Sequence, residues 1–156
     1  MTLHKELADF TIGSLTLRTP VTVQSGTTLR VAVAQMRAQQ LGCAVLVDDD
    51  RHPVGIFTEQ TLLKALVNGT ALDSATVDDF QDPAFLTVTA SDPVADIWNA
   101  VVGDGVRFVC VTDAAGELVG LTGQRGLAEH ISECCPQQVM VQRLGGQSVM
   151  QEREGA

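Results

Sequence analysis

The sequence has no tyrosine and a single tryptophan, and it has ten Lys and Arg residues against nineteen Asp and Glu. Because basic residues are outnumbered, the chain lacks the positive charge that binding to nucleic acid or to an anionic membrane surface needs. It also lacks an apolar run near the length of about eighteen residues that a membrane-spanning helix needs. The first residues show no apolar h-region, so we expect no signal peptide and a cytoplasmic location.

The sequence does contain enough apolar residues for a folded core. Of the 156 residues, 45% are apolar and 19% are charged, and the net charge is −9. This apolar content excludes intrinsic disorder for most of the chain. The length suits one compact domain or a pair of small modules, so we expect an acidic globular protein.

The four cysteines form no recognisable metal-binding or disulfide pattern. Cys43 and Cys110 lie within apolar runs, where a thiol usually acts as a small buried hydrophobe. Cys134 and Cys135 are adjacent, and no Cys-x-x-Cys or Cys/His spacing predicts a zinc site. We expect reduced structural thiols, with a redox role of the vicinal pair as the alternative.

An internal repeat organises the chain. Residues 11–66 align without a gap on residues 76–131, with few identities, among them Gly55 with Gly120. The apolar pattern is the stronger sign, because its period changes at the same places in both copies. In each copy a helical pattern is followed by two β-rich runs and then by a second helical pattern. The first helical pattern carries Leu29, Ala32, Val33 and Met36 in copy one and Val94, Ile97, Trp98 and Val101 in copy two.

Each copy predicts a β-α-β-β-α unit. Thr27 is the expected N-cap of the first helix in copy one, and Asp92 followed by Pro93 is the expected cap of its counterpart. One unit is too small to be stable alone, so we expect an α/β (α+β) fold in which the two units pack through their sheets with pseudo-two-fold symmetry. The expected strands are 21–23, 43–47 and 53–57 in copy one and 86–88, 108–112 and 118–122 in copy two.

These patterns also predict domain boundaries. Asn68 and Gly69 are typical of a helix stop at the end of copy one. The last residues combine glycine with charged side chains and are typical of a frayed tail. We expect an N-terminal arm at 1–10, a first domain at 11–68, a linker at 69–75, a second domain at 76–133 and a partly disordered C-terminal segment at 134–156.

The order of elements and three stretches of sequence resemble the cystathionine-β-synthase (CBS) domain. Residues 55–63 close the first hairpin and open the next helix, 77–83 look like the lead-in to such a domain, and 105–113 resemble its middle strand. A tandem pair of these domains is a Bateman module. The resemblance implies a stand-alone regulatory module that binds AMP, ADP, ATP or S-adenosylmethionine in the cleft between the domains. It also implies a homodimer and a separate, unidentified protein that the module regulates.

The ligand motif of the family is Gly, apolar, any, Thr/Ser, any, any, Asp. The resemblance implies that the hydroxyl and the helix N-terminus receive a phosphate, while the carboxylate holds the ribose. In copy one Thr58 matches, but Thr61 stands at the Asp position; in copy two Gly123 replaces the Thr/Ser and Gly126 replaces the Asp. A charge-assisted hydrogen bond contributes about 1.5–3 kcal/mol, so each missing carboxylate is expected to weaken a nucleoside by roughly 10- to 150-fold.

Two arginines extend the candidate site. Arg107 and Arg125 lie in or beside the matched stretches of copy two, and two guanidiniums near one cleft suit a phosphate. Other readings stay open: the arginines as solvated surface residues, Thr58 as a simple helix cap, and the glycines as either close backbone approach or decay of an unused site. The candidate ligand-binding residues are Val21, Thr22, Ala44, Ile56, Phe57, Thr58, Thr61, Arg107, Gly123 and Arg125.

The sequence shows no catalytic constellation. His4, His52 and His130 have no Cys, Asp or Ser partner at a spacing typical of a triad or a metal site. No Walker, Rossmann or HExxH motif occurs, so we expect a non-enzyme without a required cofactor. Three hypotheses remain: an adenine-nucleotide sensor, a dimerising or partner-binding scaffold without nucleotide, and a module that holds another metabolite with the same Thr and Arg side chains.

Overall fold

A computed structural model describes residues 3–82 and 85–134. The first half consists of β1 (Thr22–Val23), α2 (Leu29–Gln39), β2 (Cys43–Val47), β3 (Pro53–Thr58) and α3 (Glu59–Val67). The second half consists of β4 (Leu86–Thr89), α4 (Val94–Trp98), β5 (Phe108–Thr112), β6 (Leu118–Gly123) and α5 (Gln124–Cys134). Before and between them lie α1 (Leu3–Ala8) and two 3-10 turns, η1 (Ile12–Ser14) and η2 (Val77–Asp79), and a π-helical turn, η3 (Asn99–Gly103), continues α4.

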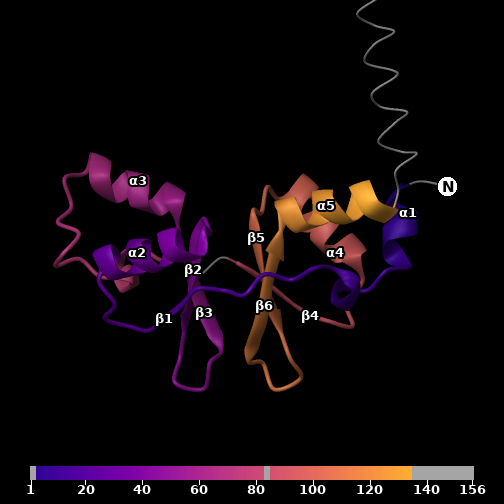
Figure 1. The fold of residues 1–156 in the computed structure, drawn as a ribbon, viewed down its shortest axis with the longest axis horizontal. Coiled ribbons are helices and arrows are strands. Elements are labelled where there is room, and N and C mark those ends of the chain that lie inside the picture. Colours follow the sequence, from indigo (N-terminus) through magenta and orange to yellow (C-terminus); the bar gives the residue numbers. More distant parts are fainter. Residues whose placement is uncertain (1–2, 83–84, 135–156) are drawn as a thin grey trace, which may run out of the picture.

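The two halves share one topology. In each, the first strand pairs in parallel with the second, which pairs antiparallel with the third, so that the described residues form two three-stranded sheets. The hairpins lie side by side in the centre, with α2 and α3 on one flank and α4 and α5 on the other (Figure 1). The predicted pair of β-α-β-β-α units is confirmed. None of the helices in the described ranges has the length and apolarity to cross a bilayer.

The sheets of the two halves pack on each other, as expected from the small size of each unit. One buried cluster draws side chains from the hairpins of both halves and forms the interface. Each half also has its own core between its sheet and its helices, because the apolar helix positions face the strands. The shared cluster comprises Cys43, Val45, Val47, Ile56, Cys110, Leu118 and Leu121.

Two predicted helix caps were wrong. The N-cap of α2 is Thr28, whose hydroxyl accepts from the Val31 N–H, while the hydroxyl of the neighbouring Thr27 donates to a backbone carbonyl instead. The residue before α4 is Pro93, and Asp92 accepts from the Thr89 N–H upstream, so its carboxylate does not cap the helix. In both places the side chain that the sequence predicts as the helix cap forms its hydrogen bond within the preceding turn instead.

Segments that lead into each half run along the hairpin of the other half. Arg18, ahead of β1, exchanges two backbone hydrogen bonds of 2.9 Å with Leu121 in β6. Asp82, ahead of β4, exchanges two with Ile56 in β3, at 2.7 and 2.9 Å. These crossings bring residues far apart in sequence to the edges of both hairpins.

The tips of the two hairpins are tied together by His52. Its Nε2 lies 3.0 Å from the Ala115 carbonyl oxygen of the second hairpin, and its Nδ1 lies 3.3 Å from Asp48 Oδ2. The Ala115 carbonyl, followed by the Asp48 carboxylate, raises the pKa of His52 above its ordinary 6.5. Because only the protonated ring donates to both acceptors, both contacts are made below pH 6.5, and one of the two is lost as pH rises through the raised pKa.

Candidate functional site

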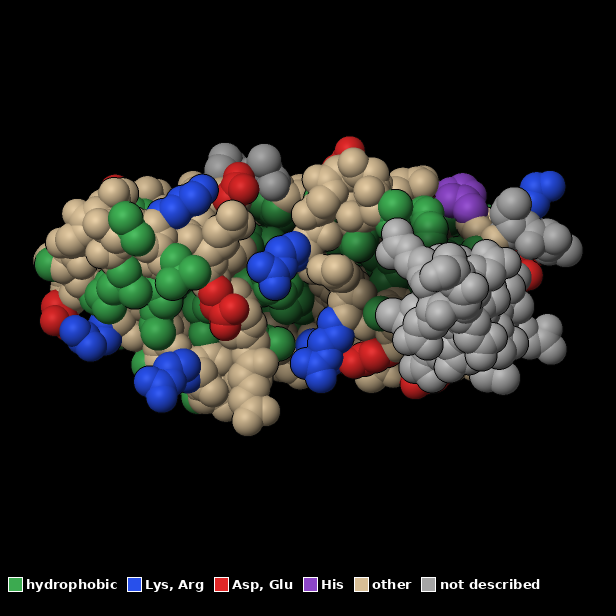
Figure 2. Space-filling view, turned by 90° about the horizontal axis from the view of Figure 1, so that it is seen from above, with side chains coloured by type: hydrophobic (Ala, Val, Ile, Leu, Met, Phe, Trp, Pro, Cys, Tyr) green, Lys and Arg blue, Asp and Glu red, His purple; other side chains and the backbone are tan. Residues whose placement is uncertain are grey.

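Two clefts open where the halves meet, beside the N-termini of α3 and α5. The cleft beside α3, cleft A, has a volume of about 300 Å³, and the cleft beside α5, cleft B, has about 250 Å³. They adjoin, because Gly42, Glu59, Arg107 and Phe108 line both. Basic and acidic side chains both lie around the hollow between the halves when the molecule is seen from the side of α3 and α5 (Figure 2).

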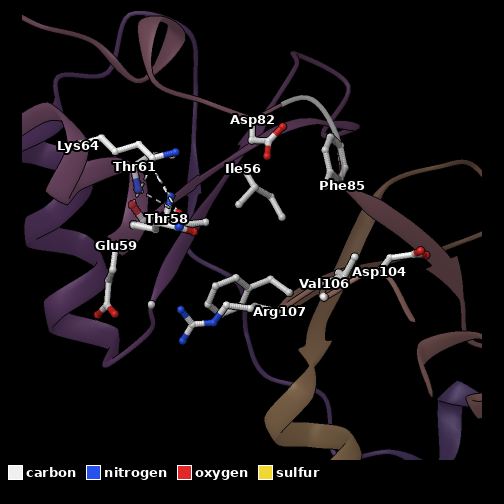
Figure 3. A pocket seen from close by; sticks show the side chains of 14 residues that line it. Ile56, Thr58, Glu59, Thr61, Lys64, Asp82, Phe85, Asp104, Val106 and Arg107 are labelled. Carbon is white, nitrogen blue, oxygen red and sulfur yellow. Dashed lines mark hydrogen bonds between the residues drawn. The ribbon is translucent and has the colours of Figure 1, made fainter. Parts of the chain in front are cut away.

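Cleft A lies between the β3–α3 junction and the segment that leads into β5. Apolar side chains of both halves, Ile56, Phe85 and Val106, form part of its wall (Figure 3). Its charged side chains are mixed in sign, so cleft A has no single electrostatic character. They are Glu59, Lys64, Asp82, Asp104 and Arg107.

Thr58 and Thr61 close the N-terminus of α3 within cleft A. The Thr58 hydroxyl accepts from the Thr61 N–H at 3.3 Å, and the Thr61 hydroxyl accepts from the Thr58 N–H at 2.9 Å (Figure 3). The Thr61 hydroxyl also donates to the Thr58 carbonyl at 2.7 Å. This reciprocal capping box shows that Thr58 does cap the helix, and both hydroxyls are engaged with the backbone.

The corresponding junction in cleft B is built differently, because Gly123 precedes α5. A Cβ on this residue would overlap the carbonyl oxygen of Arg107, the same oxygen that accepts from the Gln124 N–H at 3.1 Å. Close backbone approach therefore accounts for Gly123. With no side chain at this position, nothing equivalent to the Thr58 hydroxyl caps α5.

A cluster of three charged side chains lies at cleft B. Arg18 Nη2 is 3.0 Å from Glu129 Oε1, and Arg125 Nε is 3.3 Å from the same oxygen. Both arginines line the cleft, and Arg18 arrives there through the crossing of its segment along β6. Arg18 belongs to no motif and lies more than a hundred residues from Glu129, so no sequence signal marks it.

The ten candidate residues are distributed over several places. Ile56, Thr58 and Thr61 line cleft A, Gly123 and Arg125 line cleft B, and Arg107 lines both. Val21, Ala44 and Phe57 line neither, because their side chains are buried in the core of the first half. Thr22 lines a separate surface hollow beside α2. Cleft residues outside the family motif include Lys64 and Phe85 in cleft A, Phe108 in both clefts, and Arg18 and Thr122 in cleft B.

Other clusters of reactive side chains lie outside the clefts, and among the residues that the structure describes no His or Cys lines either cleft. His130 Nδ1 is 3.6 Å from Cys134 Sγ, one helical turn along α5. This pair was not predicted from the sequence. Asp48, Asp50 and His52 place their ligand atoms within 4.8 Å of one another. Asp48 already accepts from two backbone N–H groups and from the His52 ring, so we assign no metal to this group.

Comparisons with known proteins agree with this architecture. Residues 12–68 match the family model of the CBS domain. An uncharacterized 17.7 kDa protein of Acidianus ambivalens is 29% identical over 109 residues, which are 70% of this chain and 65% of that protein. The chain thus spans under two thirds of the length of the curated relatives that it matches.

Solved structures of CBS-domain proteins share the fold. A CBS domain protein from Pyrobaculum aerophilum, complexed with AMP, has a TM-score of 0.68 at 23% identity and covers 80% of this chain and 100% of its own. A CBS domain pair in complex with 5′-methylthioadenosine and S-adenosyl-L-methionine has a TM-score of 0.70 at 18% identity, covering 79% and 96%. Residues 12–68 therefore belong to the CBS domain family, and the chain has the fold of a CBS-domain pair.

Proposed function

We propose that this chain is a regulatory module that binds an adenosine-containing ligand in clefts A and B. The observation that carries the proposal is the pair of adjoining clefts at the junction of the halves, with Arg107 and Phe108 in the wall of both. Structures of similar fold are described with AMP or with S-adenosyl-L-methionine bound. The sequence identities of these structures to this chain are low, so support for the ligand comes from the residues that line the clefts.

The side chains of the clefts suit the parts of such a ligand. Phe85, Phe108 and Ile56 offer apolar and aromatic surface for a base, and Arg107 offers a guanidinium for a phosphate. The cleft volumes fall at or just below the lower end of those typical for small-molecule sites. Neither Thr61 nor Gly126 supplies the ribose carboxylate of the family motif, so we expect modest affinity.

A regulatory role also fits the chemistry of the clefts better than catalysis. Within the described part of the chain, their linings contain carboxylates, arginines and threonines, but no His or Cys that would act as a base or nucleophile near neutral pH. The two cleft threonines nearest α3 are hydrogen-bonded to the backbone and to each other. We propose that a separate protein, as yet unidentified, responds to the ligand.

Calorimetry and thermal unfolding with AMP, ADP, ATP, S-adenosylmethionine and NAD test this function. We expect at least one adenosyl ligand to stabilise the fold, by about 2.7 kcal/mol at one hundred times its dissociation constant. Arg107→Gln is expected to weaken binding, whereas Arg37→Gln, an exposed position that lines neither cleft, is expected to leave it unchanged. No stabilisation by any of the five at millimolar concentration would contradict the proposal.

A second candidate function, a homodimeric scaffold, is favoured by the outer face of α3. Leu63, Leu66 and Val67 are 62%, 48% and 86% exposed, an unusual run of apolar surface on one helix. The charged residues of α3 are one Glu and one Lys, so this face does not repel a second copy although the whole chain carries −9. We propose that a second copy of the chain covers this face in a two-fold symmetric contact.

Light scattering of the ligand-free protein tests the dimer. We expect a dimer for the wild type and a monomer for Leu66→Asp, because a carboxylate in an apolar contact is left without a partner. Val54→Asp is the matched control, since Val54 is 45% exposed but lies on β3 away from α3. A monomeric wild type, or equal dissociation of both variants, would rule out this contact.

A further inference from the structure

The first long helix of each half ends in a different way, although the two copies align without a gap. In the first half, α2 is a regular α-helix that is closed by a hydrogen bond of 3.0 Å from the Leu41 N–H to the Met36 carbonyl. The counterparts of these two residues in the second half are Val106 and Val101. The Val106 N–H donates instead to the Ala100 carbonyl, also at 3.0 Å, so the closing bond reaches one residue further back. The extra residue is accommodated in the π-helical turn η3.

The sequences of the two helix ends explain this difference. The last turn of α2 contains Arg37 and Ala38, which are strong α-helix formers. Their counterparts are Val102 and Gly103, a β-branched residue and a glycine, which favour the α-helix less. The α-helical hydrogen bonds are therefore weakly specified at the end of α4. Single π-helical turns are rare in proteins and are frequent at functional sites.

The residues before the π turn are held in place. Ile97 is fully buried, and Trp98 packs against the core of the second half. At the first residue of the turn, Asn99 Oδ1 lies 3.2 Å from Nε2 of His4 in α1. A change in the winding of the turn would have to break these contacts in order to move α4. We therefore expect such a change to displace the residues that follow the turn.

The residues that follow have room to move, and they reach cleft A. Residues 102–105 are exposed, and a Cβ built on either glycine among them would meet no other atom of the described chain within 4 Å. Asp104, Val106 and Arg107 lie along one side of cleft A (Figure 3). One residue of an α-helix corresponds to about 1.5 Å along its axis, so a change of register by one residue moves these side chains by a comparable distance.

We propose that the end of α4 is a register switch, which alternates between the π turn and an α turn like the end of α2 and thereby moves one wall of cleft A. The first half has the α turn in the same number of residues, so both arrangements fit between the helix and the middle strand. A ligand that touches Asp104, Val106 or Arg107 favours one register, because its contacts differ between the two. The inference rests on the proposed function for this ligand, whereas the two registers exist without it.

NMR relaxation dispersion of the ligand-free protein tests for the two registers, because helix register shifts occur in microseconds to milliseconds. We expect exchange at residues 100–107 and none at their counterparts, residues 35–42. The double variant Val102→Ala/Gly103→Ala changes two positions that line neither cleft. Since alanine is the strongest α-helix former, we expect the double variant to shift the ratio of the registers toward the α turn by about 10-fold.

Val31→Ala is the matched control. It removes the same atoms from an exposed valine of α2 that lines neither cleft, and we expect it to leave the exchange at residues 100–107 unchanged. No exchange at residues 100–107 of the wild type would overturn the switch. Exchange of equal size at residues 35–42, or an equal response to the control and to the double variant, would overturn it as well.

Titration with AMP, followed by calorimetry and by the same NMR signals, tests the link to cleft A. We expect AMP to change the exchange at residues 100–107. We also expect the double variant to change the affinity for AMP by about 3- to 10-fold, because affinity follows the population of the register that binds. AMP binding that leaves the exchange and the variant's affinity unchanged would contradict the switch and leave the proposed function in place. If no adenosyl ligand binds, the proposed function fails, and the ligand-free exchange still decides whether the switch exists.

Discussion

Replacing Gly123 with alanine is expected to lower the free energy of unfolding by about 2–4 kcal/mol. A Cβ at this position would overlap the backbone oxygen of Arg107 and lie 3.0 Å from its carbonyl carbon. Backbone atoms cannot rotate away as a side chain does, so β6 and the start of β5 must separate. The loss is a large part of the 5–15 kcal/mol that is typical of a folded domain.

Urea unfolding followed by circular dichroism measures this loss. Gly103→Ala is the control, because a Cβ on Gly103 would meet no atom within 4 Å and this residue has no positive φ. We expect that control to stay within about 1 kcal/mol of the wild type. If both alanine variants had the same midpoint, close approach would not explain Gly123, and decay of an unused site would remain as its explanation.

Alkylation of Cys43 and Cys110 is expected to be at least about 100-fold slower in the native protein than in urea. Burial is the main cause that raises the pKa of each thiol from 9.0 to about 12, and for Cys43 the neighbouring Cys110 contributes a smaller part of that rise. Because the thiolate is the reactive form, three pKa units alone reduce its fraction by roughly a thousandfold. Both thiols belong to the cluster between the sheets, so their protection reports on that interface.

Mass spectrometry of iodoacetamide-treated peptides measures the two rates separately. Cys134 is exposed and serves as the internal control, which we expect to react readily in the native state. Equal native and unfolded rates for Cys43 and Cys110 would show that the two sheets do not stay packed in solution.

The fold is predictable from this sequence because each element is specified locally. The helical spacing of Leu29, Ala32 and Met36 and the apolar run from Cys43 to Val47 all place buried residues where the structure has them. The caps were harder to predict, since Thr27 and Thr28 are adjacent and chemically identical. Their roles depend on which hydroxyl the preceding turn engages, and that is a property of the turn in three dimensions.

The site is predictable in part. The family motif leads to Thr58, Thr61, Gly123 and the arginine at 125, all of which lie at the clefts. It does not lead to Arg18, because that residue enters cleft B through the pairing of its segment with β6. Motif matching also ranks the first copy higher, whereas Arg18 and Arg125 lie at the cleft of the second. The position of Arg18 depends on a contact between the copies, which a comparison of the copies cannot supply.

Because segments of each half cross to the other half, the residues matched by the family model do not coincide with a part of the chain that folds by itself. The family model covers residues 12–68, yet Ile12 and Leu15 are buried in the core cluster of the second half, together with Leu7 of α1. A chain cut after residue 68 would remove these side chains from the core they complete and would strip β3 of its pairing with Asp82. The two halves therefore gain their stability jointly, and the duplicated sequence encodes one cooperative body.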